Sequence, residues 1–563
     1  MGRRRNRFVL GIYKLGVGTE VAALEVVGLS PHAQSGLGRA TRRQTETGPK
    51  GADFDLSLST RMASMLSRQF VAAIGAAVIG CSAAEAQTPS RITFSRVVTE
   101  PGLGNLEFVH AAADFNGDGR DDILAGGADG GGAMPEDRFT KTMLEVLVSV
   151  GDGSFRHAPE LVEGTINVRN PVVVADDFNG DMRPDLAVFD GGVYVTAHSL
   201  GYGNPPQLFL SDQDGRLRPS DALANAVRQE HELRPNPDYS GPQDLHLKSA
   251  ASGDIDGDGD IDLWVDSIGG ANVSSHFMVN NGDGTFTLDE ARAPPELRYN
   301  WPEAWYHLAG HLVDLDNDGD LDLALGQNRG TYPETINQFS IVLINDGTGH
   351  YPARTELPRP AFADGYTSVT GQTHFDVNGD GVQDLILAHP RNDDGPPSVL
   401  PWTGRYIQVL VNEGVPSPVF RRRRAMSFVD ETSTWMGSQR STTPERNAVG
   451  DPLHNGAEPR MHDVDRDGCA DLVMVRGPYP LGDEAPLIYR NNGSGQFQAV
   501  SPEAPLAGTS RHIVPADLNG DRVIDFVYPQ HHNGPDNRYR TADDFVTFVA
   551  FLNTTPPGPV RCE

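Results

Sequence analysis

The chemistry that this sequence suggests most strongly is the binding of divalent cations by clusters of oxygen ligands. A nine-residue segment with Asp at position 1, Asp or Asn at 3, Asp at 5 and Asp at 9 occurs seven times, most clearly as Asp254–Asp262. Side-chain oxygens at these positions, with the backbone carbonyl of position 7, would surround one cation. Gly usually stands at position 6, where a tight turn would direct the side chains toward one point.

The seven segments are called loop 1 to loop 7 in chain order, and the position-7 residue of each would contribute only its backbone carbonyl. The candidate metal ligands are Asp114, Asn116, Asp118, Arg120 and Asp122 in loop 1; Asp177, Asn179, Asp181, Arg183 and Asp185 in loop 2; Asp254, Asp256, Asp258, Asp260 and Asp262 in loop 3; Asp314, Asp316, Asp318, Asp320 and Asp322 in loop 4; Asp376, Asn378, Asp380, Val382 and Asp384 in loop 5; Asp463, Asp465, Asp467, Cys469 and Asp471 in loop 6; and Asp517, Asn519, Asp521, Val523 and Asp525 in loop 7.

Calcium is the natural occupant, because it accepts six to eight oxygens in a flexible geometry. We therefore expect up to seven Ca2+ ions, bound most tightly in loops 3, 4 and 6, which carry four carboxylates each. Met182 and Arg522 replace the position-6 Gly of loops 2 and 7. We expect these residues to strain their loops and to weaken metal affinity.

The acidic balance of the chain agrees with cation binding. Its formal net charge is -30 over 563 residues, and the loops hold 24 carboxylates at ligand positions. Without an ion each loop would crowd three or four negative charges together, which is unfavourable. We therefore expect calcium to contribute to folding. An acidic protein of this kind would repel phosphate, so no nucleic-acid partner is expected.

Short predicted strands surround each loop, and the loop starts are 54 to 87 residues apart. In the third repeat, small residues at 249–253 precede the loop and an apolar strand at 263–265 follows it. A second apolar run at 277–280 is followed by a turn at 281–284 and a short strand at 285–287. Each repeat is therefore predicted to form four strands, and four-stranded sheets repeated radially are β-propeller blades.

The seventh repeat lacks a fourth strand after the strand predicted at 545–553, but residues 92–97 have the right pattern to supply it. The predicted fold is therefore all-β, a seven-bladed β-propeller of four-stranded antiparallel blades over 87–563, with the ring closed by the N-terminal strand. This closure leaves no open sheet edge.

The repeats resemble FG-GAP/VCBS repeats, the calcium-binding blades of the integrin α-subunit propeller and of many secreted bacterial proteins. The resemblance rests on phrases such as Ala113–Gly119 and Asn378–Gly381, and it covers about residues 90–555. It implies a ligand on the face opposite the metal loops, where insertions at 218–246, 295–307 and 421–460 are expected.

Two features of these insertions have alternative interpretations. An aromatic cluster would stack sugar rings, anchor a protein partner or pack under a long connection; it consists of Tyr299, Trp301, Trp305 and Tyr306. The run Arg421–Arg424 would clamp carboxylates of an acidic glycan or form a solvated charge run. Residues 220–233 are expected to include a helix, and Trp435 lies in the last insertion.

Catalysis has little support in the sequence, which contains no G-x-S-x-G, H-E-x-x-H or phosphate-binding loop. His307 and His311 would share one strand face, whereas other histidines precede loops at inconsistent offsets, which argues against a designed ring; these are His110, His374, His462 and His512. We favour extracellular recognition or adhesion through a protein or glycan ligand. The alternatives are a carbohydrate-active enzyme, such as a polysaccharide lyase on a calcium-stabilised propeller, and a structural module without a fixed ligand.

Residues 62–86 have the pattern of a signal peptide, with Arg68, an apolar run and the cleavage motif Ala84–Ala86. The run is too short to span a bilayer, so no transmembrane segment is expected. Val78–Cys81 also resembles a lipobox, which would anchor a lipoprotein through Cys81. Residues 1–61 would then be an over-extended or disordered N-terminus. We expect a monomer that is secreted, periplasmic or on the cell surface.

Two further cysteines, Cys469 and Cys562, could form one disulfide or remain free or structural thiols. Sequence spacing alone does not decide between these alternatives.

Overall fold

A computed structural model describes residues 6–9 and 25–28, and it describes most of 92–562. Within that range it leaves out 100–105, 107, 127–141, 169–170, 192–193, 197–198, 201–204, 234–246, 268–274, 295–306, 328–338, 361–367, 390–405, 417–423, 438, 440–456, 477–487, 492, 494–495, 501–512, 533–544 and 559–561. The predicted signal peptide with Cys81, the aromatic cluster at 299–306, Arg421–Arg423 and His512 therefore lie outside the described residues.

The chain divides into two units, 1–87 and 88–563. In the first unit, β1 (Asn6–Val9) pairs with β2 (Glu25–Gly28) in an antiparallel arrangement. Among the described residues, no helix is both long enough and apolar enough to cross a membrane.

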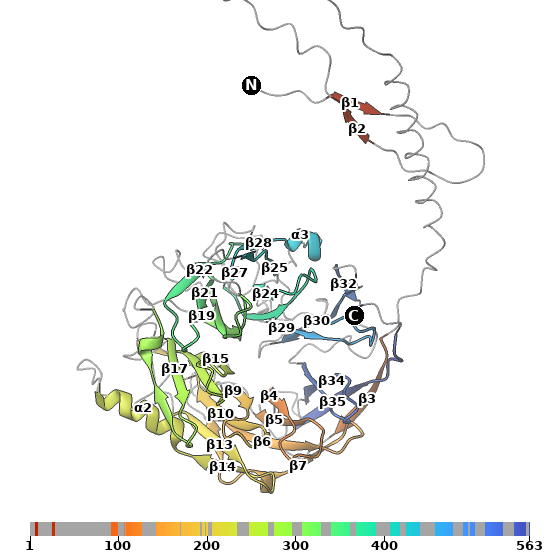
Figure 1. The fold of residues 1–563 in the computed structure, drawn as a ribbon. Helices are drawn as coiled ribbons and strands as arrows, with labels where there is room; N and C mark the ends of the chain where they lie inside the picture. Colours follow the sequence, from red (N-terminus) through yellow and green to blue (C-terminus); the bar gives the residue numbers. More distant parts are fainter. Residues whose placement is uncertain are drawn as a thin grey trace, which may run out of the picture. The chain divides into compact units, whose positions relative to one another are not determined.

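The second unit contains seven antiparallel sheets with four strands along each, called blades 1 to 7 after their loops (Figure 1). The strands are β4 (Phe108–Ala113), β5 (Asp122–Gly126), β6 (Thr142–Ser149) and β7 (Phe155–His157) in blade 1; β9 (Pro171–Asp176), β10 (Asp185–Asp190), β13 (Gln207–Ser211) and β14 (Leu217–Ser220) in blade 2; β15 (Leu247–Gly253), β16 (Asp262–Ser267), β17 (Ser275–Asn280) and β18 (Phe286–Leu288) in blade 3; β19 (His307–Val313), β20 (Asp322–Gln327), β21 (Ile341–Ile344) and β22 (Ala353–Glu356) in blade 4; β23 (Gly371–Phe375), β24 (Asp384–His389), β25 (Tyr406–Asn412) and β28 (Phe428–Asp430) in blade 5; β29 (Ala457–His462), β30 (Asp471–Arg476), β31 (Ile488–Asn491) and β32 (Phe497–Val500) in blade 6; and β33 (Val514–Ala516), β34 (Asp525–His532), β35 (Phe545–Asn553) and β3 (Phe94–Thr99) in blade 7.

Smaller elements decorate this framework. They are β8 (Ile166–Val168), which pairs with β6; the pairs β11 (Tyr194–Thr196) with β12 (Ser199–Leu200) and β26 (Val415–Pro416) with β27 (Arg424–Ala425); the helices α2 (Ala222–Leu233) and α3 (Thr432–Trp435); and the 3-10 turns η3 (Pro159–Leu161) and η4 (Glu290–Arg292). The helix expected between 220 and 233 is thus present as α2. Trp435 is half-buried and donates a hydrogen bond from Nε1 to Glu431 Oε2 at 3.1 Å.

The blades form a closed ring, as the sequence predicted. The first strands of blades 1 to 6 contact one another in chain order, and β33 contacts both blade 6 and β4 of blade 1 (Figure 1). Since neighbouring strands are antiparallel, the connections between strands 1 and 2 and between strands 3 and 4 lie at one end of each blade. The other connections lie at the opposite end, so the ring has a metal-loop face and an opposite face.

The N-terminal strand closes the last blade, which confirms the sequence prediction. β3 pairs with β35 from Phe94 opposite Asn553 to Thr99 opposite Phe548. The strand begins two residues later than the predicted 92–97, while Thr93 bonds to the C-terminal segment through Thr555 Oγ1 at 2.9 Å. Both ends of the propeller therefore meet in blade 7.

Neighbouring blades pack through apolar side chains of their middle strands. Trp264 of β16 is fully buried in a cluster with Leu323 and Leu343 of blade 4. Gly310 of β19 makes room for it, because a Cβ there would lie 1.8 Å from the Trp264 Cζ3 atom. Small residues thus precede the loops because the first strands are crowded against adjacent blades.

Candidate metal centres

The seven loops occupy equivalent places in the fold. In every blade, eight residues separate strand 1 from strand 2, as 114–121 do in blade 1, and position 9 is the first residue of strand 2. The structure therefore places the predicted ligands of each loop at one end of its own sheet.

The loop backbone requires left-handed conformations at two positions. Residues at positions 4 and 6 have positive φ in all seven loops. Met182 and Arg522 adopt φ 67 and φ 64 at position 6, where the sequence predicted strain. Sequence analysis missed position 4, which holds Gly in five loops and Asn317 or Arg466 in the others. The recurring Gly at position 4 was the signal that could have found it.

Carboxylates at positions 1 and 5 fix the turn of each loop. In all seven loops, the position-1 carboxylate accepts the N–H of position 6, as Asp314 does from Gly319 at 3.0 Å. Likewise, the position-5 carboxylate accepts the N–H of position 7, as Asp318 does from Asp320 at 3.1 Å. These Asp residues therefore shape the loop in addition to any role as ligands.

The position-9 carboxylates are buried, with at most 1% exposure in every blade. Each accepts a backbone N–H from the end of the third strand, as Asp322 does from Asn345 at 3.0 Å. In loops 2 to 7 the second oxygen also accepts the N–H of position 2.

Burial raises the pKa of these carboxyl groups, because it disfavours the charged form. The pKa is raised to about 6 for Asp185, to about 8 for Asp322 and to about 7 at position 9 of the other five loops. Backbone hydrogen bonds lower it in part, whereas acidic neighbours in the same loop raise it further. A cation in the loop would oppose this shift.

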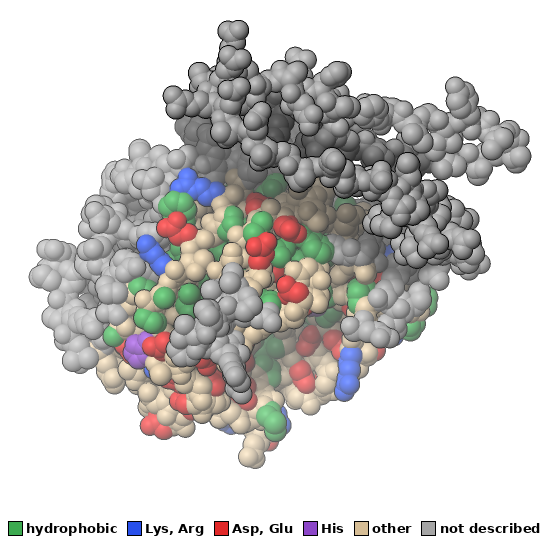
Figure 2. All heavy atoms as spheres, turned by 45° about the horizontal axis from the view of Figure 1, so that its top comes forward, with side chains coloured by type: hydrophobic (Ala, Val, Ile, Leu, Met, Phe, Trp, Pro, Cys, Tyr) green, Lys and Arg blue, Asp and Glu red, His purple; other side chains and the backbone are tan. Residues whose placement is uncertain are grey.

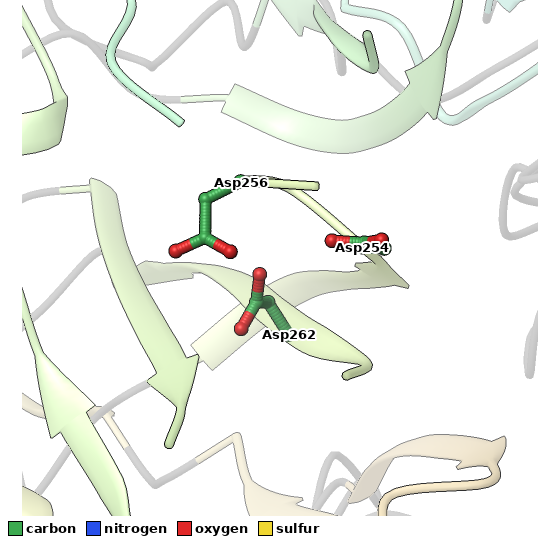
Figure 3. Close-up of side chains that lie close together, drawn as sticks. All are labelled: Asp254, Asp256 and Asp262. Atoms are coloured by element: carbon green, nitrogen blue, oxygen red, sulfur yellow. The ribbon is translucent and has the colours of Figure 1, made fainter. Parts of the chain in front are cut away.

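Within the part of the chain that the structure describes, three groups of carboxylates come together closely enough to hold a metal ion. In each, oxygens of positions 1, 3 and 9 lie within 4.8 Å of one another: Asp254, Asp256 and Asp262; Asp314, Asp316 and Asp322; and Asp463, Asp465 and Asp471. Figure 3 shows Asp256 and Asp262 of loop 3 pointing toward each other with Asp254 beside them. These are the three loops that carry Asp at position 3.

The position-3 oxygens of loop 3 fit a cation. Asn at position 3 in loops 1, 2, 5 and 7 accepts the N–H of position 5, as Asn116 does from Asp118 at 2.9 Å. By contrast, Asp256 Oδ1 is buried and accepts no hydrogen bond from the part of the chain that the structure describes. Its other oxygen pairs with Arg292 at 2.9 Å. A buried carboxylate oxygen of this kind is stabilised by a cation.

In five blades, a side chain at the end of the third strand links the loop to that of the preceding blade, among the described residues. Asn345 donates from Nδ2 to Ile255 O in loop 3 at 2.8 Å and to Leu321 O in its own loop at 3.1 Å. Its Oδ1 accepts the N–H groups of Gly347 and Gly349 at 3.0 and 3.1 Å.

The same bridge to the preceding blade recurs around the ring. It is formed by Asn280 to Phe178 O, Asn412 to Leu315 O, Asn553 to Val464 O and, through a hydroxyl, Ser149 to Leu518 O. Sequence analysis placed Asn280 and Asn553 at the ends of predicted strands and gave these residues no role between blades, because a bridge between repeats requires knowledge of which loop lies adjacent.

Two histidines on the first strands of neighbouring blades are in contact, although their spacing from the following loops differs. His311 Nε2 of β19 lies 2.6 Å from His374 Nδ1 of β23, in the neighbouring blade. Burial lowers the pKa of His311 to about 3 and also lowers that of His374. Among the described residues, no group of three metal-binding side chains includes either histidine. The pair thus joins blades 4 and 5 through a contact between their first strands.

The structure joins Cys469 and Cys562 in a disulfide, with Cα atoms 5.1 Å apart. This decides between the two alternatives that the sequence left open. Because Cys469 occupies position 7 of loop 6, the bond ties the C-terminal segment to that loop.

Acidic side chains are also visible on the molecular surface. On the face that Figure 2 shows, Asp and Glu are more widely visible than Lys and Arg among the described residues. This distribution agrees with the formal net charge of -30.

A protein-family model matches three segments of the chain. The model of the FG-GAP-like repeat matches residues 114–188, 254–325 and 463–528. These repeats and the seven-bladed ring fit an FG-GAP repeat propeller. A search of curated proteins found no match.

Several solved structures are similar to this chain. A lectin of Agrocybe aegerita, described as recognising non-reducing terminal N-acetylglucosamine, has 17% identity and a TM-score of 0.40 over 74% of this chain and 82% of the lectin. An exo-beta-1,3-galactanase from Phanerochaete chrysosporium has 10% identity and a TM-score of 0.28 over 82% of this chain and 97% of its own. The extracellular region of plexin A4 has 10% identity and a TM-score of 0.36 over 82% of this chain and 40% of its own.

Proposed function

We propose that this FG-GAP repeat propeller is a secreted, calcium-stabilised recognition or adhesion protein. It would bind an extracellular protein or glycan through the face opposite the metal loops. The observation that supports this proposal is the contrast between the metal loops and the connections on the opposite face of the ring. The metal loops have one length in all blades. The connections on the opposite face differ in length, from the short segment 268–274 to the long segment 221–246.

This contrast separates a structural role from a recognition role. A connection that is repeated without change in every blade serves the framework, as the loop hydrogen bonds do. Connections that differ from blade to blade on a rigid framework are where binding specificity usually resides. The opposite face therefore offers several independent segments around one ring.

The donor set of the loops supports calcium rather than a softer metal. The three groups of carboxylates contain only oxygen ligands, and they lack the imidazole and thiolate groups that zinc and copper favour. Asp256 Oδ1 adds a buried oxygen suited to a hard cation. When bound, calcium would neutralise the carboxylates and hold strands 1 and 2 of a blade together.

Binding of the full chain to arrays of extracellular glycans and surface proteins, with calcium or with a chelator, tests this proposal. We expect saturable binding in calcium that is lost when 441–455 is replaced by a Gly-Ser segment of equal length. The control replaces Gln213 and Asp214 of a metal-face hairpin by Ser, and should leave binding unchanged.

Two outcomes would count against the recognition role. One is the absence of saturable binding to any array member while the calcium-loaded protein is folded. The other is release of unsaturated sugar from an acidic polysaccharide, which would favour a lyase instead.

A further inference from the structure

An arginine side chain enters the ligand cluster of loop 6. Arg490 of β31 forms an ion pair from Nε to Asp465 Oδ2, and its guanidinium lies 3.3 Å from Asp467 Oδ2. Both carboxylates are fully buried, and Arg490 is 8% exposed. The arginine thus pairs with the position-3 and position-5 carboxylates, which are the groups expected to bind a metal ion.

This arginine is specific to blade 6. The equivalent residue, directly before the third-strand residue that bonds to position 9, is apolar in the other blades: Val148, Leu210, Val279, Ile344, Val411 and Leu552. A guanidinium in contact with both carboxylates would repel an incoming dication, and it places one positive charge beside these buried groups.

Loop 3 provides an informative contrast. There, Arg292 comes from η4 after the fourth strand and pairs with one oxygen of Asp256 at 2.9 Å. No bond joins Arg292 to the position-5 carboxylate among the interactions of the described residues. The second oxygen of Asp256 is buried beside Asp254 and Asp262, as the equivalent carboxylates of loop 6 are. The difference between the two loops is therefore the contact of Arg490 with the position-5 carboxylate of loop 6.

The C-terminal segment covers loop 6 as well. Gly558 N–H donates to Arg466 O at 2.9 Å, and Arg466 donates from its guanidinium to Thr555 O at 3.0 Å. A Cβ at Gly558 would lie 3.1 Å from the Asp467 Cβ, so the segment passes close to the loop. The Cys469–Cys562 disulfide makes this attachment covalent.

We propose that loop 6 holds no calcium, and that Arg490 and the C-terminal segment take the place of the ion there. Loop 6 then keeps its hydrogen-bonded conformation with or without calcium, whereas the loops that bind the ion need it to keep theirs. This inference rests on the proposed calcium binding by other loops. It replaces the sequence-based expectation that loop 6 is among the tightest sites.

The test compares the full-length protein with its Arg490→Leu variant, since Leu stands at the equivalent position of blades 2 and 7. Native mass spectrometry at saturating calcium should count one more bound ion in the variant. Arg292→Leu is the matched control, because loop 3 can hold an ion with its arginine in place, and its ion count should equal that of the wild type.

Hydrogen exchange of the wild type with calcium or chelator gives a second readout that needs no variant. The amides of Gly468 and Cys469, which bond to loop-6 carboxylates, should keep their protection in chelator. Those of Gly319 and Asp320 in loop 4 should lose it.

Loss of loop-6 protection on chelation, or an equal ion count in wild type and Arg490→Leu, would overturn the inference. Absence of any bound ion, with loop 4 indifferent to chelator, would instead refute the proposed calcium binding. The two failures are therefore distinguishable.

Discussion

Acidification should weaken calcium binding by different factors in different loops. The position-9 carboxyl group must lose its proton to serve as a ligand, and burial raises its pKa to about 6 in Asp185, about 7 in Asp262 and about 8 in Asp322. Each pH unit below such a pKa lowers the apparent affinity about tenfold. These three loops thus differ in the pH at which protons begin to compete with the ion.

The size of the effect follows from these pKa values. Between about pH 8 and about pH 6, the fraction of deprotonated carboxylate falls about twofold for a pKa of about 6, about tenfold for about 7 and about 50-fold for about 8. Apparent calcium affinity should therefore fall least in loop 2, more in loop 3 and most in loop 4.

Stability of the metal-free protein should have the opposite pH dependence. The folded-state pKa of these groups lies above the ordinary value of 3.8, so the folded protein binds more protons than the unfolded chain. Their stabilisation is present at low pH and is lost as pH rises through about 7. Buried histidines such as His311 and His462, whose pKa values burial lowers, contribute the opposite slope only below 6.5.

Calorimetric titration of chelated protein with calcium, in two buffers of different ionisation enthalpy near pH 7, measures the protons released per ion. Loop-resolved hydrogen exchange at about pH 6 and pH 8 assigns the affinities to individual loops. Asp322→Asn serves as the control, since it removes the titrating group of loop 4. Equal affinities at both pH values, with no proton release, would show that position 9 is not a ligand.

Three further perturbations have defined outcomes. Asp256→Asn should lower the calcium affinity of loop 3 on the order of tenfold by removing one charged ligand, whereas Asp283→Asn in an exposed hairpin should leave it unchanged in calorimetry. Asn345→Ala should destabilise the protein by about 2–4 kcal/mol in urea unfolding, because it removes two buried and two partly buried hydrogen bonds. Asn491→Ala, which lacks a bridge to the preceding blade among the described residues, should cost about 1 kcal/mol, and equal losses would contradict the bridging role. Gly310→Ala should cost about 3 kcal/mol or more, because its methyl group would overlap the buried indole ring, and a melting temperature unchanged from wild type would refute that packing.

The fold was predictable because one local pattern recurs with its strands. The metal loop marks the join between strands 1 and 2, and the Asn-Gly or Asp-Gly turn marks the join between strands 3 and 4. Closure by the N-terminal strand followed from counting strands, and the pairing of β3 with β35 confirms it.

The contacts between blades were less predictable, because they depend on registers that a single repeat does not contain. The offsets of His311 and His374 from their loops differ by one residue, yet the two rings are in contact. In the sequence, nothing distinguishes Arg490 from an ordinary strand residue. Its role becomes evident from its contacts with Asp465 and Asp467 in the structure. The spacing thus predicted the types of the metal ligands. The residues that neutralise these ligands or bridge the blades could be identified only from the assembled ring.

Closure of the ring by β3 also constrains the order of events during synthesis. Thr93 bonds to Thr555, 462 residues further along the chain, so a nascent chain cannot complete blade 7 until nearly all of it has emerged. Contacts between such distant segments slow folding. Until then, β3 presents an unpaired edge, and a chain truncated before β35 keeps that edge exposed to aggregation.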